Sequence, residues 1–397
     1  MQGLSVADMM LALCRAALRG EGCTTLPRDD EHMQKLYAVA HHHDMAHIVS
    51  YALYRAGALD TASEVGAKLQ KAQMLSLFRY EHQRVELSES CRVLEEGGIV
   101  HLPLKGSVLR ALYPEPWMRT SSDIDLLVHK EDIPRAEALL TEQLGYRKQT
   151  FETEHDISLY SPSGVHIELH YDLIEDDRIG PASALLRDIW SYTKEVEGCH
   201  YRRAMTDEMF YFYHIAHMAK HFAGGGCGVR TFMDLWLLEQ QSSFDAAAAD
   251  VLLAQGELTT FARTARCVSH AWFSGGALDA LAKDMAGFVL QGGTYGDKTN
   301  YVAIRHMKGE NKLSYALSRI FMPYDQLIHT YPSLKGRKYL TFFYQMRRLV
   351  RGTLQGKLRG GVSELKYNAQ MTDDKAEDMA HLFERLELPS GGKIQGE

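Results

Sequence analysis

Apolar residues recur at spacings of three and four through the first part of the chain. Such spacing is typical of helices that bury one face. The longest uninterrupted pattern runs from Glu64 to Glu96 and stops at Gly97-Gly98, a pair that ends helices. Residues 1–96 are therefore predicted to form an N-terminal helical region.

The pattern changes after Gly98, where short apolar runs alternate with helical spacing. Four such runs predict β-strands, at Ile99–Leu104, Ser122–Val128, His155–Tyr160 and Val165–His170. Helical spacing lies between them at Val108–Tyr113 and at Ile133–Leu144, which Gly145 closes. The whole pattern predicts an α+β fold in which a small mixed β-sheet core, residues 97–200, is flanked by N-terminal and C-terminal helical regions.

Helical spacing returns at Thr206, so residues 201–390 are expected to form a C-terminal helical domain. Three consecutive glycines at 224–226 predict a break between two of its helices. The Gly- and charge-rich residues 391–397 are expected to form a frayed tail.

A basic segment, residues 326–363, stands out in this domain because it contains eight Lys or Arg and no acidic residue. These cations are Lys335, Arg337, Lys338, Arg347, Arg348, Arg351, Lys357 and Arg359. Tyr331, Leu334, Tyr339 and Phe343 recur at near-helical spacing and are expected to pack the segment onto the domain. The charges then form either a solvated outer face or an RNA-binding surface.

Composition limits the classes of protein that the chain can belong to. Its 397 residues are 45% hydrophobic and 24% charged, which predicts a folded protein of two or three domains. The net charge of −7 excludes a protein whose whole surface binds a polyanion. Six scattered cysteines, the lack of a signal pattern and the lack of a membrane-spanning run predict a cytoplasmic protein with reduced thiols and no membrane partner.

Two carboxylates fall on one face of the second predicted strand. Asp123 and Asp125 are two residues apart, and such side chains point to the same side of a strand. Adjacent carboxylates repel each other without a cation, and their hard oxygens favour Mg²⁺, or Mn²⁺ in its place. Residues alternate in the same way on the fourth strand, where Glu168 lies on one face with His166 and His170. Placed beside Asp123 and Asp125, Glu168 would make a set of three carboxylates, which can hold two metal ions for an in-line phosphoryl displacement.

A phosphate site is predicted where the first core helix begins, at Gly106-Ser107. Free N–H groups and the positive end of a helix dipole suit a phosphate there, and Gly106 lets the backbone approach it closely. The same pair is also typical of a simple N-cap. Lys105 and Arg119 flank this region, where they either neutralise a triphosphate or are ordinary solvated charges.

Together these motifs resemble the polymerase-β-type nucleotidyltransferase superfamily. They are Lys105-Gly106-Ser107, Arg119, Asp123-Ile-Asp125-Leu-Leu-Val and Val165-His-Ile-Glu168-Leu-His170. The chain is most similar to the uncharacterised bacterial branch of that superfamily, over most of residues 30–350 and most clearly over 99–170.

The resemblance implies an enzyme that transfers a nucleoside monophosphate from an NTP to an acceptor hydroxyl, with Mg²⁺ or Mn²⁺ as cofactor. Asp123, Asp125 and Glu168 would then be catalytic and would bind the metal. Lys105, Gly106, Ser107 and Arg119 would bind the nucleotide. The acceptor stays open between a small molecule, a protein side chain and an RNA end.

Several residues are candidates for the substrate side of such a site. His166 and His170 share the face of Glu168 and either orient it or the acceptor, or form hydrogen bonds without a chemical role. A helical stripe that bears His214, His217, Lys220 and His221 is expected to border the cleft, and its histidines also suit, less well, a zinc site.

Three further residues have two interpretations each. Arg230 and Asp234 are four residues apart and either pair on one helix or, as the resemblance implies, position substrate. Trp117 either stacks on a base or packs in the core.

Two rival functions also fit the sequence. The first is a nucleotide-binding or regulatory protein that keeps the fold but has lost turnover. The presence of all three acids weighs against it. An RNA-binding helical scaffold would use residues 326–363, so nucleic acid is an open but not the favoured partner.

Overall fold

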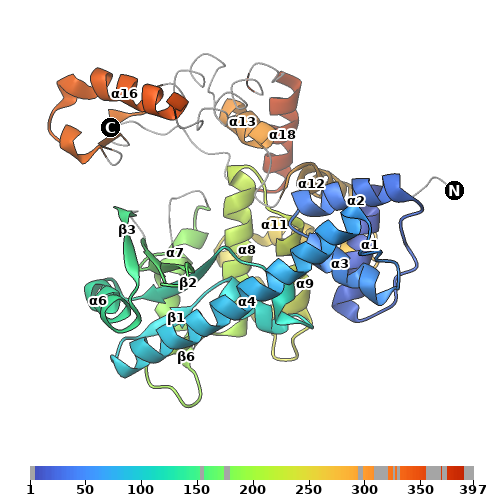
Figure 1. Ribbon diagram of the computed structural model, residues 1–397, viewed down its shortest axis with the longest axis horizontal. Coiled ribbons are helices and arrows are strands. Elements are labelled where there is room, and N and C mark those ends of the chain that lie inside the picture. Colours follow the sequence, from blue (N-terminus) through green and yellow to red (C-terminus); the bar gives the residue numbers. More distant parts are fainter. Residues whose placement is uncertain are drawn as a thin grey trace.

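The computed structural model describes residues 5–152, 156–173, 179–293, 298–307, 321–324, 327–328, 331–354, 368 and 373–388. Figure 1 shows a small β-sheet beside a larger assembly of helices that comes from both ends of the chain. The predicted α+β class, with a small mixed sheet and flanking helices, is confirmed.

Helices fill the N-terminal region, as the spacing of its apolar residues predicts. They are α1 (Val6–Arg19), α2 (Asp30–His42), α3 (Ala46–Arg55) and α4 (Glu64–Glu96). The first begins with a capping box between Ser5 and Asp8 and ends at Gly20, whose φ of 67° suits glycine. The long α4 starts at the Ser63 cap and stops at Gly97.

Five strands form the main sheet: β1 (His101–Pro103), β2 (Asp123–Val128), β3 (Arg147–Glu152), β4 (Asp156–Tyr160) and β5 (His166–His170). Their order is β1-β2-β5-β4-β3. The central pair β2-β5 is parallel and the other pairs are antiparallel, which makes the sheet mixed.

Alternation along the central strands divides their side chains between two faces. Ile124, Leu126 and Ile167 are fully buried in a core cluster. Residues of α4 and of α6 (Ile133–Leu144) belong to the same cluster, so these helices cover the apolar face of the sheet. The opposite face keeps the acidic residues, as the alternation predicts.

The structure differs from the predicted elements at two places. The edge strand β3 is not predicted, because its polar Arg147-Lys-Gln-Thr sequence lacks alternation. The helix expected at Val108–Tyr113 is instead a single α-turn, α5 (Gly106–Leu109), followed by a 3-10 turn. Pro114 accounts for the early stop, because the residue before a proline avoids the helical region and Tyr113 is extended.

The second half of the chain forms a short hairpin and then helices. These elements are α7 (Ala182–Arg187), β6 (Thr193–Glu195), β7 (Arg203–Met205), α8 (Asp207–Gly224), α9 (Val229–Glu239), α10 (Ala246–Gln255), α11 (Thr259–Phe273), α12 (Ala280–Gln291), α13 (Lys298–Met307), α16 (Thr341–Leu354) and α18 (Asp373–Arg385). One hydrophobic core joins α1 and α3 with α8, α9, α11 and α12, so the two helical regions pack together. The break expected at 224–226 separates α8 from α9.

Trp117 packs in this shared core rather than offering a face for stacking. Its ring is 7% exposed and meets the rings of His47 and Tyr51 edge-on. The turn that bears Trp117 therefore fixes the approach to β2 against the N-terminal helices. None of the helices within the described residues is long and apolar enough to cross a bilayer.

Candidate active site

The acidic residues of the two central strands lie side by side. In the parallel ladder Asp125 is opposite Glu168, and Asp123 is opposite His166. The metal-ligating atoms of Asp123, His166 and Glu168 lie within 4.8 Å of one another, and so do those of Asp125, Glu168 and His170. The structure thus brings the three predicted acids together, with Glu168 common to both groups.

Asp125 is the most deeply buried of these acids, at 2% exposure. Lys105 Nζ lies 2.7 Å from its Oδ1, and His170 Nε2 lies 2.8 Å from the same atom. Burial alone would raise the pKa of Asp125, but the charge of Lys105 and the hydrogen bond from His170 outweigh it and hold the pKa well below its usual value. Asp125 is therefore a carboxylate at neutral pH.

His170 joins two of the acids. Its Nε2 lies 3.3 Å from Glu168 Oε2 as well as beside Asp125. Burial would lower the pKa of His170, but these two hydrogen-bonding carboxylates raise it to about 9. His170 is thus within hydrogen-bonding distance of Glu168, whereas His166 Nδ1 is 3.9 Å from Glu168 Oε1.

Asp123 accepts hydrogen bonds from two serines that the sequence analysis does not single out. Ser121 Oγ and Ser122 Oγ lie 3.1 Å and 3.0 Å from its two carboxylate oxygens. Burial, and then the charges of Asp125 and Glu168, raise the pKa of Asp123. A divalent cation would relieve this repulsion between like charges.

The Lys105-Gly106 turn lies directly against this serine pair. Lys105 adopts φ 45°, a region that non-glycine residues rarely enter. A Cβ on Gly106 would lie 3.1 Å from Ser121 Oγ and 3.2 Å from Ser121 Cβ. Glycine thus allows close packing beside Ser121, which donates a hydrogen bond to Asp123, and a side chain here would push Ser121 aside.

The prediction that a helix dipole favours phosphate at Gly106-Ser107 is wrong. The helix α5 has one turn, so few peptide dipoles add up at its start. The backbone N–H of Ser107 already donates to Leu104 O at 3.0 Å. The Ser107 residue lines a second pocket, with Arg202 and Phe244, rather than the pocket of the acids.

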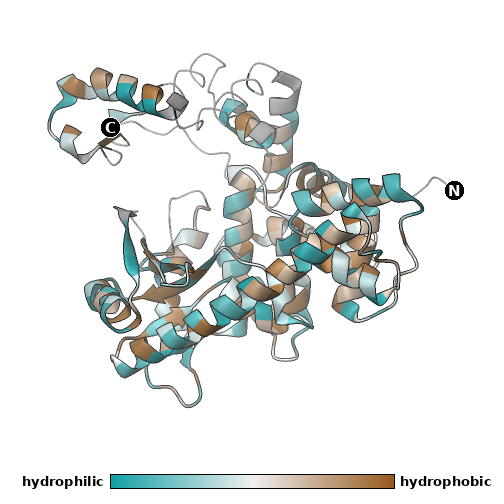
Figure 2. Ribbon diagram, in the orientation of Figure 1, coloured by the Kyte–Doolittle hydropathy of each residue, from teal (hydrophilic) through white to brown (hydrophobic). Residues whose placement is uncertain are grey.

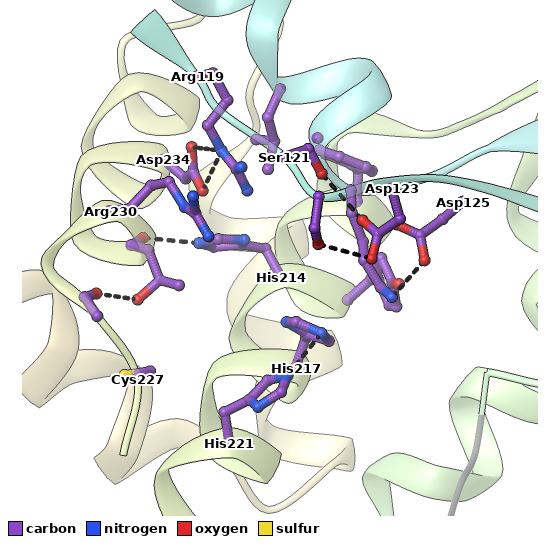
Figure 3. Close-up of a pocket in the computed structure, with 18 of the residues that line it drawn as sticks. Arg119, Ser121, Asp123, Asp125, His214, His217, His221, Cys227, Arg230 and Asp234 are labelled. Atoms are coloured by element: carbon purple, nitrogen blue, oxygen red, sulfur yellow. Dashed lines mark hydrogen bonds and ion pairs between the residues drawn. The ribbon is translucent and has the colours of Figure 1, made fainter. Parts of the chain in front are cut away.

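A pocket of about 220 Å³ opens in front of Asp123 and Asp125, between the sheet and the helices α8 and α9. Figure 3 shows side chains from both sides pointing into it. Of the predicted residues it is lined by Lys105, Gly106, Arg119, Asp123, Asp125, His214, His217, His221, Arg230 and Asp234. Lys220 is half-buried on α8 and is not among the lining residues.

Two ion pairs form the far wall of the pocket. Arg119 Nε lies 2.8 Å and 3.0 Å from the two carboxylate oxygens of Asp234, and both side chains are buried. Arg230 Nη1 lies 3.1 Å from Asp44 Oδ2. The interpretation of Arg230 and Asp234 as a pair on one helix is therefore wrong, because each pairs with a residue from the first half of the chain.

Asp44, the ion-pair partner of the pocket-lining Arg230, is a residue that sequence reasoning missed. It lies just after α2, has φ 56°, and accepts a hydrogen bond of 2.8 Å from Thr120 Oγ1. Its only sequence signal is a lone Asp after three histidines, which is too common to mark a site. Through Thr120 and Arg230, Asp44 links the N-terminal helices to β2 and α9.

The histidine stripe on α8 divides into two parts. His214 Nε2 is 2.9 Å from Thr231 O and has a structural role between α8 and α9. His217 and His221 lie with their Nε2 atoms 3.1 Å apart at the pocket. Burial, and then the nearby His221 and Lys105, hold the pKa of His217 well below its usual value. Among the described residues the stripe has no third metal donor, so the zinc interpretation gains no support.

Comparison with known proteins gives one family. The profile of a family described as uncharacterised nucleotidyltransferase matches residues 29–274, which include the whole pocket. No curated protein matches the sequence.

Proposed function

Because the chain belongs to the family of uncharacterised nucleotidyltransferases, we propose that it transfers a nucleoside monophosphate from an NTP to an acceptor hydroxyl and releases pyrophosphate. We also propose that its sheet and acids correspond to a polymerase-β-like core. The observation that carries the proposal is the direct pairing of Asp125 with Glu168 across β2 and β5, with Asp123 on the same face.

The donor atoms suit a hard divalent cation. The carboxylates of Asp123 and Asp125 each lie within 4.8 Å of that of Glu168, and together they offer the oxygen ligands that Mg²⁺ and Mn²⁺ prefer. The like-charge repulsion at Asp123 is consistent with a site that receives positive charge. When bound, such ions supply the charge that stabilises the attacking and leaving oxygens in a phosphoryl displacement.

The pocket charges also favour a nucleotide that arrives with its own cations. Each of the three cations that line the pocket beside a carboxylate already has that partner: Lys105 with Asp125, Arg119 with Asp234, and Arg230 with Asp44. These side chains therefore have little uncompensated charge to offer a free triphosphate. Metal-bound NTP is the better match.

The remaining roles follow from position. Gly106 lets the backbone meet the phosphates at the pocket edge, and Lys105 holds Asp125 as a carboxylate. Glu168, which His170 orients, is placed to accept a proton from the acceptor hydroxyl. His217 is neutral at neutral pH, so one of its ring nitrogens can accept a hydrogen bond from the acceptor.

The test is to incubate the chain with each α-labelled NTP, Mg²⁺ or Mn²⁺ and a cell extract, and to follow the label and the released pyrophosphate. Asp125→Asn should keep the fold and lose transfer by about a thousandfold or more, because the strand is intact while a carboxylate ligand is lost. Asp132→Asn, a matched change just after β2 and outside the pocket, should keep full transfer.

Undiminished transfer by folded Asp125→Asn would remove this residue from the reaction. Tight NTP binding without pyrophosphate release under every condition would instead support a nucleotide-binding protein without turnover.

A further inference from the structure

The segment that bears α16 has a small core of its own. Leu327, Tyr331 and Leu334 are buried there, and Leu340 and Tyr344 pack against them. Tyr344 also shares a hydrogen bond of 2.9 Å with Ser333. The helix is thus anchored through one face.

The face of α16 away from this core is apolar and exposed. Tyr339 is 81% exposed, and the four residues that follow it at helical spacing, Phe342, Phe343, Met346 and Val350, are exposed by 70%, 62%, 44% and 55%. At 100° per residue the four positions on α16 fall within an arc of about 100°, and Tyr339 lies in the 3-10 turn just before the helix. The prediction that Tyr339 and Phe343 pack the segment onto the domain is therefore wrong. Tyr331 and Leu334 are buried, but in the small core of the segment itself rather than against the rest of the domain.

Positive charge lies along one side of this apolar face, where Arg347 and Arg351 are exposed. Six of the eight predicted cations lie among the described residues, namely Lys335, Arg337, Lys338, Arg347, Arg348 and Arg351. Lys357 and Arg359 lie outside the described residues, as do residues 391–397. No acidic residue occurs between 327 and 354. Two of the cations lie over aromatic rings of the small core, with Arg347 5.7 Å from the Tyr331 centroid and Lys338 5.5 Å from that of Tyr324.

We propose that α16 binds in the plane of an anionic lipid surface. Its aromatic and aliphatic face would enter the boundary between headgroups and acyl chains, while the Lys and Arg side chains contact lipid phosphates. Figure 2 shows apolar and polar positions alternating along α16, and Figure 1 places the helix at the periphery of the molecule. The site of nucleotidyl transfer has no part in this attachment, so the proposal goes beyond the proposed function.

The chemistry of the face favours lipid over RNA. RNA would match the cations and stack on aromatic rings, but it would leave Met346 and Val350 in water. Lipid matches the cations and also removes the whole apolar strip from water. Since the chain as a whole has a net charge of −7, attraction to an anionic surface needs a local basic region, and this segment provides one.

The test uses the full chain and flotation with two kinds of vesicle, phosphatidylcholine alone and phosphatidylcholine with about 30% phosphatidylglycerol. We expect binding to the anionic vesicles only. Phe342→Ser with Phe343→Ser should weaken this binding about tenfold or more, because two exposed rings that would enter the lipid are lost. Tyr54→Ser with Val251→Ser removes two exposed apolar side chains from other helices and should leave binding unchanged.

The cations are tested separately. Arg347→Ala with Arg351→Ala removes two exposed arginines beside the apolar face, and it should weaken binding to anionic vesicles by about fivefold per residue and reduce its salt dependence. Nucleotidyl transfer serves as the check that each variant is folded, and it should be unchanged in all of them.

Three results would overturn the proposal. One is the lack of binding of the parent chain to anionic vesicles at low salt. Another is equal binding by the Phe342/Phe343 variant and the Tyr54/Val251 control. The third is RNA binding that the arginine variant loses and the phenylalanine variant keeps, which would assign the segment to nucleic acid.

Discussion

Arg119 and Asp234 form a buried, two-point ion pair although 115 positions separate them in the sequence. Arg119 precedes β2 and Asp234 lies on α9, so the pair joins the strand of the acids to the helical wall of the pocket. The Tyr113 hydroxyl donates a further hydrogen bond of 2.7 Å to Asp234. This connection thus ties together two segments that line the pocket.

Asp234→Asn should lower the free energy of unfolding by about 3–5 kcal/mol, because the buried Arg119 guanidinium loses its counter-charge. Urea denaturation measures the change. The double variant Arg119→Met with Asp234→Leu should lose less than the single one, since no charge then stays buried alone. If the double variant lost as much free energy of unfolding as Arg119→Met and Asp234→Leu lose together as single variants, the two charges would act independently.

Glu168→Gln should leave NTP binding measurable and abolish product, because the amide neither binds a divalent cation as a carboxylate does nor accepts a proton. Isothermal titration with NTP and a label-transfer assay measure the two effects separately. Asp172→Asn, two residues beyond β5, is the matched control and should retain transfer. The reverse outcome, with Asp172 essential and Glu168 dispensable, would place the third acid at Asp172.

The centre of this site could be predicted because it depends on local periodicity. Alternation along a strand decides that Asp123 and Asp125 share one face, and the same rule applies to Glu168. Ser121 and Ser122 could have been found too, since they directly precede the first acid and their hydroxyls reach it.

The wall of the pocket could not be predicted in this way. Arg230 is four residues from Asp234, which suggests a pair within the helix, yet tertiary packing gives Arg230 to Asp44, 186 positions away. Local spacing cannot report which distant segment meets a helix face. The same limit explains Phe343, whose apolar spacing predicts a helix face but not whether anything covers it.

Gly106→Val should weaken triphosphate binding by about tenfold or more, because a branched side chain must displace Ser121, which orients Asp123. Binding of NTP and of NMP decides whether the loss is specific to the β- and γ-phosphates. The control Gly287→Val places the same side chain where nothing lies within 4 Å of a Cβ, so it should bind both ligands normally. An equal loss for NTP and NMP in Gly106→Val would indicate general misfolding.

The buried histidine His43 should make the fold sensitive to acid. It is 1% exposed at the end of α2, and burial, together with the neighbouring His42, lowers its pKa to about 4. The unfolded chain has a histidine pKa near 6.5, so between these values it binds a proton that the folded chain does not. Protonation of His43 then favours unfolding. The contribution of neutral His43 to the free energy of unfolding is complete above about pH 6.5 and is lost as the pH falls towards 4.

We expect His43 alone to reduce the free energy of unfolding by on the order of 3 kcal/mol across this window. Urea denaturation at several pH values between 7 and 4.5 measures the slope. His43→Gln removes the titrating group and should flatten that slope, whereas His41→Gln, an exposed neighbour on the same helix, should leave it unchanged. If both variants kept the slope of the parent chain, the acid sensitivity would come from other buried histidines, such as His47 or His214, whose pKa values burial also lowers.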